Sequence, residues 1–113
     1  MATLVNKVRS NPLGSVDAAS FQYSITSAEI FSFDHGFAAR PRHADLFIVC
    51  VTAELGFAVG DKVKISASES ITISVNKQSC RIAAVTVPSI VNASNVATAI
   101  TPANWNWFVT LED

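Results

Sequence analysis

Alternation of apolar and polar residues is the main pattern of the chain from residue 28 onward. In DKVKIS (residues 61–66) and SITISVN (residues 70–76), every second side chain is apolar. A period of two predicts strands with one face toward a core and the other toward solvent. The segment SCRIAAV (residues 79–85) continues the pattern, with Cys80 and Ile82 on one face.

The C-terminal segment NWNWFVTL (residues 104–111) carries the bulkiest apolar side chains. Its alternation places four of them on one face: Trp105, Trp107, Val109 and Leu111. Such a face is typical of a sandwich core, so Trp105 and Trp107 are candidate core residues. An exposed tryptophan pair beside Asn104 and Asn106 would instead form a platform on which a sugar stacks.

Two further segments extend the all-β pattern. ADLFIVCVTA (residues 44–53) is a continuous apolar run, which predicts a strand covered on both faces. AEIFSF (residues 28–33) predicts a strand that ends at the turn DHGFAARPR, where Gly36 and Pro41 interrupt regular structure.

The remaining segment, PSIVNASNVATAITPAN (residues 88–104), is ambiguous and has room for one strand. No long helical period is present. Short strands at roughly 10-residue spacing predict an all-β fold, an antiparallel, jelly-roll-like β-sandwich over residues 28–113.

Residues 1–27 lack this periodicity. NKVRSNPLGSVDAAS (residues 6–20) is interrupted by Asn, Pro, Gly and Ser, which predicts an extended N-terminal arm. A short strand at FQYSIT (residues 21–26) would close the arm. In this interpretation the arm attaches the protein to a partner surface, and residues 1–20 can be deleted without loss of the sandwich.

The glycines of TAELGFAVGDKVKI (residues 52–65) suggest two kinds of loop. A phosphate-binding loop needs four residues between its glycines, then Lys and Ser or Thr before a helix. Here three residues separate Gly56 from Gly60, Asp61 would repel phosphate, and a strand follows. We therefore interpret Gly56, Gly60 and Asp61 as a structural turn, in which the glycines permit positive φ and the aspartate bonds nearby backbone N–H groups.

Composition adds an expectation about assembly. Hydrophobic residues make up 50% of the 113 residues and charged residues only 15%, against roughly a quarter in ordinary soluble proteins. A small compact monomer would be short of polar surface, which predicts an obligate oligomer. With a net charge of −1, the scattered Lys and Arg form no basic stripe for nucleic acid, and no apolar run reaches the ~18 residues that span a membrane.

The two cysteines, Cys50 and Cys80, each lie in an apolar strand-like run. The start of the chain, MATLVNKVRSNP, has no apolar segment of a signal peptide, so synthesis in a cytoplasm is expected. We therefore predict buried, reduced thiols in the core rather than a disulfide.

The sequence predicts no catalytic residues, no cofactor and no metal site. His35 and His43 flank the turn, with acids beside them, but solvated or turn-bonding histidines explain this better than a metal centre. No nucleophile-elbow motif is present. The acids Glu29 and Glu54 have no partner that would make a general acid–base pair.

Residues 35–65 and the closing NW segment resemble a module of bacteriophage virion proteins, found at the ends of tail-fibre chains and in small separate virion proteins. The shared pattern is His-Gly and a Pro, an apolar strand ending near Cys-x-Thr, an AELG[YF]…VGD turn and an NW strand. The matching positions are His35, Gly36, Pro41, Cys50, Thr52, Ala53, Glu54, Leu55, Gly56, Phe57, Val59, Gly60, Asp61, Asn104 and Trp105.

The resemblance covers most of residues 28–111 and implies a homotrimeric β-rich assembly in a virion. The chain is also somewhat similar to small trimeric or hexameric sandwich lectins, whose sugar-binding residues have no counterpart that can be placed here. A sandwich with an arm, and no shaft, would fit a capsid decoration or cement protein. It would be made in a bacterial host and bind the major capsid protein or another virion protein. The alternative is a tail-fibre tip or lectin-like receptor-binding module with a host glycan as ligand.

Overall fold

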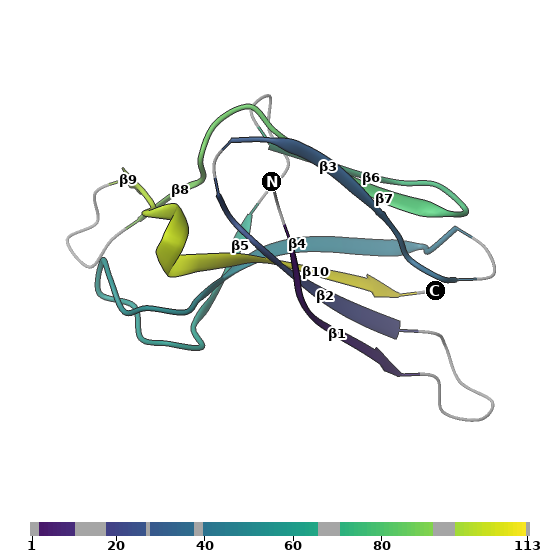
Figure 1. Ribbon diagram of the computed structural model, residues 1–113, viewed down its shortest axis with the longest axis horizontal. Helices are drawn as coiled ribbons and strands as arrows, with labels where there is room; N and C mark the ends of the chain where they lie inside the picture. The colour runs from purple at the N-terminus through teal and green to yellow at the C-terminus, as the bar shows by residue number, and fades with distance from the viewer. Residues whose placement is uncertain are drawn as a thin grey trace.

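The protein folds into antiparallel strands that form two main sheets packed face to face, as the computed structural model shows (Figure 1). The predicted all-β sandwich is confirmed. The structure describes residues 3–10, 18–26, 28–37, 40–65, 71–91 and 97–112. No helix within these ranges is long and apolar enough to cross a membrane.

The larger sheet has five strands. Their order across the sheet is β1 (Leu4–Ser10), β2 (Ala18–Ser24), β10 (Trp105–Glu112), β4 (His43–Cys50) and β5 (Lys62–Ile65). The last strand of the chain, β10, thus lies at the centre, paired with β2 on one side and β4 on the other.

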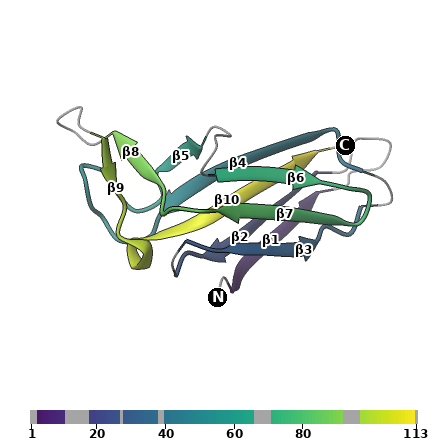
Figure 2. The same cartoon turned by 90° about the horizontal axis from the view of Figure 1, so that it is seen from above.

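The facing sheet has three strands, in the order β3 (Ile30–Asp34), β7 (Ser79–Ala84) and β6 (Ile71–Val75). Figure 2 shows this sheet lying across the larger one. The successive strands β2, β3 and β4 therefore alternate between the two sheets. The ambiguous region 88–104 contributes two short strands rather than one, β8 (Ser89–Val91) and β9 (Ala97–Ala99), followed by a 3-10 turn at Pro102–Asn104.

The core lies between the two main sheets. Alternation along β10 points four side chains inward, each at most 1% exposed: Trp105, Trp107, Val109 and Leu111. Aromatic contacts join the layers, since the rings of Phe21 on β2 and Phe33 on β3 lie 4.6 Å apart. The inward positions of β7, including Cys80 and Ile82, are fully buried.

The N-terminal segment differs from the extended arm that the sequence suggested. Strand β2 is an internal strand between β1 and β10, with Ala19 and Phe21 buried in the core. The alternation of Ala19, Phe21 and Tyr23 with polar residues carries a strand signal that the neighbouring turn-forming residues hide. Strand β1 shows no inward pattern because it is an edge strand, exposed over residues 3–8. Residues 11–17, which include the Pro and Gly of the expected arm, lie outside the described residues.

Candidate functional site

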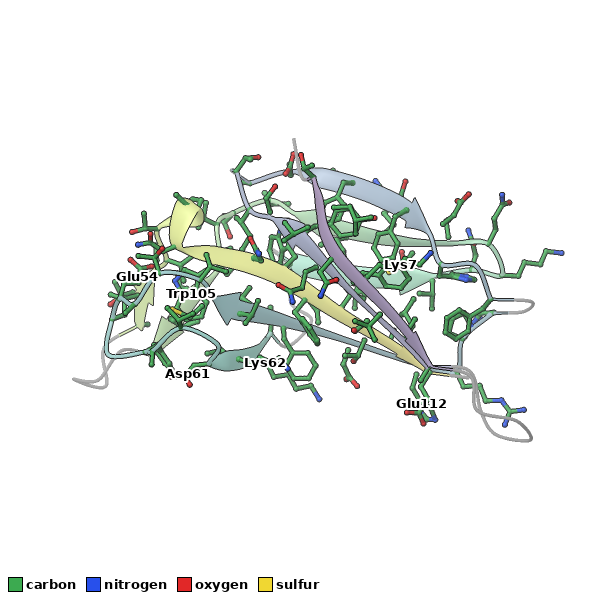
Figure 3. The ribbon with its side chains drawn as sticks, turned by 60° about the horizontal axis from the view of Figure 1, so that its bottom comes forward. Lys7, Glu54, Asp61, Lys62, Trp105 and Glu112 are labelled. Carbon is green, nitrogen blue, oxygen red and sulfur yellow. The ribbon has the colours of Figure 1, made fainter. Side chains whose placement is uncertain are left out.

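The residues of the AELG…VGD motif form a loop that closes onto the start of β10. The carboxylate of Glu54 is its centre, and Figure 3 shows Glu54 beside Trp105. Glu54 Oε1 accepts hydrogen bonds from the Thr101 backbone N–H at 2.9 Å and from the Trp105 indole N–H at 2.6 Å. Glu54 Oε2 accepts one from the Asn104 side-chain amide at 3.0 Å. The two parts of the motif, the loop and the NW pair, are thus bonded to each other.

These hydrogen bonds set the protonation of Glu54. Partial desolvation raises the pKa of this carboxyl, but the bonds from Thr101, Asn104 and Trp105 outweigh it and leave the pKa below its ordinary value of 4.5. The carboxylate is therefore ionised at neutral pH and supplied with donors. An ionised carboxylate of this kind accepts hydrogen bonds that hold the loop against the start of β10, and it has no proton to donate as a general acid.

We expect the Glu54→Gln variant to lose on the order of 1 kcal/mol of stability at neutral pH, because charge-assisted bonds to a partly exposed group become neutral ones. Since the folded-state pKa is lowered, the stabilisation is present above the ordinary value of 4.5 and is lost as pH falls through the folded-state value. Urea denaturation from about pH 7 to about pH 3 should therefore show the wild type and variant converging. A difference that stayed constant with pH would contradict the role of the charge.

The turn residues Gly56, Gly60 and Asp61 shape the same loop. Gly56 (φ 89°) and Gly60 (φ 96°) adopt the left-handed conformation, as does Leu55 (φ 56°). Asp61 Oδ2 accepts a hydrogen bond from the Ala58 N–H at 2.9 Å, so the aspartate bonds a nearby backbone donor. At residue 60 glycine is favoured by the backbone, because a φ of 96° is strained for other residues; space is not the reason, since a Cβ there would meet no atom within 4 Å.

The cysteines lie in the core at two different places. Cys50 ends β4, and its thiol donates to the Thr52 carbonyl at 3.1 Å. Cys80 is fully buried in β7, where desolvation raises the pKa of its thiol to about 12. A thiol with such a pKa stays protonated and is a poor nucleophile. Both cysteines are free.

Thiol labelling of the native protein is expected to be slow at both cysteines, because both side chains have no exposed surface. After unfolding, two equivalents should react without added reductant, since the chain contains two cysteines. Fast labelling in the native state would contradict the burial of these strands.

His35 is a buried turn histidine and not a solvated one. Its ring is fully buried, Nδ1 accepts a hydrogen bond from the Phe37 N–H at 3.0 Å, and Nε2 lies 2.7 Å from the Asn76 carbonyl oxygen. The carbonyl can only accept, so Nε2 carries the proton and the imidazole is neutral. His43 lies elsewhere, at the start of β4. No group of three metal-ligating side chains converges within the described ranges.

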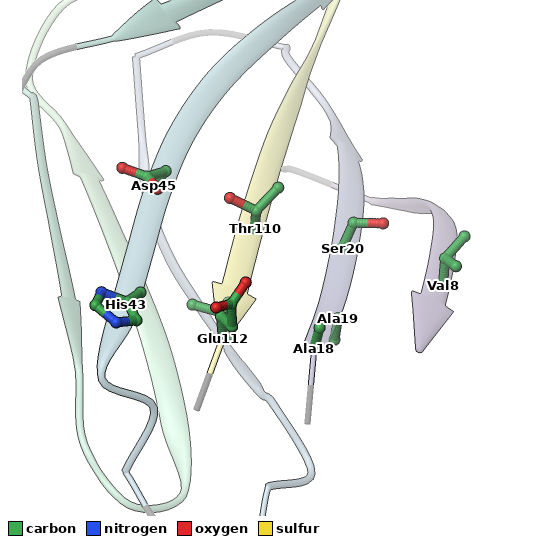
Figure 4. Close-up of a pocket in the computed structure, with 9 residues that line it drawn as sticks. Val8, Ala18, Ala19, Ser20, His43, Asp45, Thr110 and Glu112 are labelled. Carbon is green, nitrogen blue, oxygen red and sulfur yellow. The ribbon is translucent and has the colours of Figure 1, made fainter. Parts of the chain in front are cut away.

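A hollow lies on the outer face of the five-stranded sheet, near the end of β10 that is remote from Glu54 (Figures 3 and 4). We call it the outer-face hollow and define it by six residues: Val8, Ser20, His43, Asp45, Thr110 and Glu112. Its volume is about 540 Å³. The pairing register places Val8, Ser20, Thr110 and Asp45 in one row across four strands, and His43 opposite Glu112 in the next.

The polar groups of the outer-face hollow are open to solvent. Four of its side chains form no hydrogen bond to another described residue: Ser20, His43, Thr110 and Glu112. Asp45 forms an ion pair with Lys64 on β5, between Oδ1 and Nζ at 3.3 Å, and its carboxylate remains about half exposed.

Comparisons with protein-family models, characterised proteins and solved structures give no match to this chain.

The sequence pointed to part of this arrangement. The sequence marks Glu54 as a position of the shared motif without an acid–base partner, but its bonds to Asn104 and Trp105 were missed, because those residues lie about fifty positions away. The outer-face hollow was also missed. Its available signal is the short polar residues Ser20 and Thr110 at solvent-facing positions of β2 and β10.

Proposed function

We propose that this protein is a structural component of a bacteriophage virion, a homotrimer that decorates the capsid and stabilises the shell. One observation carries the proposal: large apolar side chains are exposed where β1 and β3 begin and just after β7 ends, segments that lie near one another in Figures 1 and 2. The exposed fractions are 48% for Leu4, 55% for Val5, 57% for Ile30 and 69% for Val85. Side chains of this kind are expected at the contacts between subunits.

The strand pairing relates the segments that carry these four residues. Leu4 at the start of β1 pairs with Tyr23 near the end of β2, and a short connection leads from β2 to Ile30 at the start of β3. Ile30 is opposite Ala83, two residues before Val85. We call Leu4, Val5, Ile30 and Val85 the apolar corner.

Two edge strands flank the apolar corner. Neither β1 nor β3 has a strand partner on its outer side within the described part of the chain. An edge with unpaired backbone groups and apolar side chains is a site for pairing with another chain. Together with the low charge content of 15%, this supports assembly into an oligomer.

The resemblance to phage virion modules supports the choice of a homotrimer in a virion. The loop and NW residues that carry the resemblance hold the fold together through Glu54, which suits a module defined by its scaffold and not by an active site. The mechanism would be mechanical, since surface buried across capsid subunits resists their separation. The partner would be the major capsid protein or another virion protein, and no nucleic acid, membrane or cofactor is involved.

Light scattering on the purified protein should give the mass of a trimer. The double variant Val5→Asp, Ile30→Asp is expected to shift the mass to that of a monomer, because it places charge in the apolar corner. The matched control is Val59→Asp, at a residue that is 66% exposed but lies in the motif loop. A wild-type monomer at micromolar concentration, or an equal effect of the control, would contradict the proposal.

The alternative is a tail-fibre tip or lectin-like receptor-binding module, which the outer-face hollow favours. Labelling the protein in purified virions distinguishes the two roles. Signal over the capsid supports decoration, and signal confined to the tail supports the alternative.

A further inference from the structure

We propose that the outer-face hollow is a binding site for a neutral glycan, held by its hydroxyl groups. The inference concerns a ligand site and does not depend on whether the protein sits on the capsid or the tail. It rests on the shape of the hollow, the kinds of polar groups it presents and the aromatic row beside it.

The shape comes from the small residues at the centre of the sheet. Ser20 and Thr110 are short side chains on adjacent internal strands, while longer ones, His43 and Glu112, stand at one end. Val8 forms an apolar side wall from β1 (Figure 4). The volume of about 540 Å³ lies within the range of ~300–1,000 Å³ that is typical of small-molecule sites.

The polar groups are matched to a ligand that both donates and accepts hydrogen bonds. The hydroxyls of Ser20 and Thr110 can do either, whereas the carboxylates of Asp45 and Glu112 only accept. A pyranose offers several O–H groups in fixed directions, which can donate to the carboxylates and accept from the hydroxyls. Its C–H surface would lie against Val8.

Charge selects among glycans. Asp45 and Glu112 would repel a carboxylate, sulfate or phosphate group on the ligand. Lys64, the cation that contacts Asp45, already pairs with Oδ1 of this residue from the neighbouring strand β5. The site is therefore assigned to neutral sugars and not to acidic ones.

A second row on the same face extends the site. Phe47 and Phe108, two residues along β4 and β10 from Asp45 and Thr110, pack against each other with ring centroids 6.2 Å apart. Both are half-buried and lie on the outer face, so they offer apolar surface to a longer oligosaccharide. Lys62 lies over the Phe108 ring with Nζ 4.4 Å from the centroid and would have to move aside for a sugar to stack there.

The test uses the intact protein and the methyl glycosides of glucose, galactose and mannose as probes, followed by amide NMR shifts. We expect at least one probe to shift the amides of Ser20, Asp45 and Thr110 with a Kd on the order of 1 mM, as suits an open site with few polar groups. Thr110→Val should weaken binding about tenfold, because it removes one hydrogen bond without changing shape. Thr72→Val, on the exposed face of β6, is the matched control and should leave the affinity unchanged.

Several results would overturn the assignment. These are no shift with any probe up to about 50 mM, shifts that map outside the hollow, or binding that survives the double variant Ser20→Ala, Thr110→Val. Methyl glucuronide, which is anionic, should bind more weakly than methyl glucoside, and equal affinity would contradict the role of the carboxylates. Binding of arginine amide at the hollow without any sugar would identify a site for a basic peptide instead. Light scattering tests the oligomer separately. The absence of sugar binding would therefore contradict the glycan site without contradicting the proposed virion role.

Discussion

Replacing Trp105 or Trp107 by alanine is expected to lower the free energy of unfolding by about 3–5 kcal/mol, which would unfold a marginally stable domain. Both indoles are at most 1% exposed and belong to the core, at the first and third residues of the central strand β10. Urea denaturation at a fixed protein concentration measures the effect, because an oligomer's stability depends on concentration. A loss below about 1 kcal/mol would show that the side chains are not in the core.

Phenylalanine at the same two positions separates packing from hydrogen bonding. The Trp105 indole N–H donates to Glu54 at 2.6 Å, while the Trp107 indole N–H is buried and meets no acceptor among the described residues. The loss of ring volume is the same in both variants. Trp105→Phe should therefore cost about 1.5 kcal/mol more than Trp107→Phe, since it alone breaks a bond to a charged group. Equal costs would show that the Glu54 bond contributes nothing.

Deletion of residues 1–20 is expected to abolish cooperative folding. It removes β1 and the first three residues of β2, including the buried Ala19, and leaves β10 with an incomplete partner strand. This reverses the expectation from the sequence, in which the same segment was a dispensable arm. Circular dichroism and thermal melting of the truncated protein measure the outcome. A folded trimer with an unchanged Tm would support the interpretation of residues 1–20 as a dispensable arm.

A shorter deletion, of residues 1–10, serves as the control. It removes only β1, whose described side chains are exposed, so the sheet keeps β2 as its new edge. We expect a folded protein with reduced stability and, because Leu4 and Val5 are lost, a weakened oligomer.

The sequence predicted those strands whose alternation marks a buried face. β5, β6, β7 and β10 follow the period of two, and β4 follows as an apolar run. The edge strand β1 could not be predicted this way, because both of its faces meet solvent and no apolar period is imposed. β2 carried a usable signal in Ala19, Phe21 and Tyr23, which the composition of the preceding residues obscured.

The site was less predictable than the fold. The loop's glycines and Asp61 predict a turn, because the conformational preferences of these residue types are local and depend only on neighbouring residues. The bonds of Glu54 and the row Val8–Ser20–Thr110–Asp45 depend on which strands are neighbours. Strand order is a long-range property that alternation does not encode, so no local pattern could place these side chains together.

The central position of β10 also has a consequence during synthesis. A nascent chain on the ribosome has made β2 and β4 long before the strand that joins them. The larger sheet can therefore close only after β10 has been made, and β10 pairs with a strand that lies far from it in the chain, which slows folding. Fragments that end early would expose the inner faces of β2 and β4 and be recognised as unfolded. Only chains that contain β10 would then be able to assemble with a partner, so the larger sheet has to be complete before assembly.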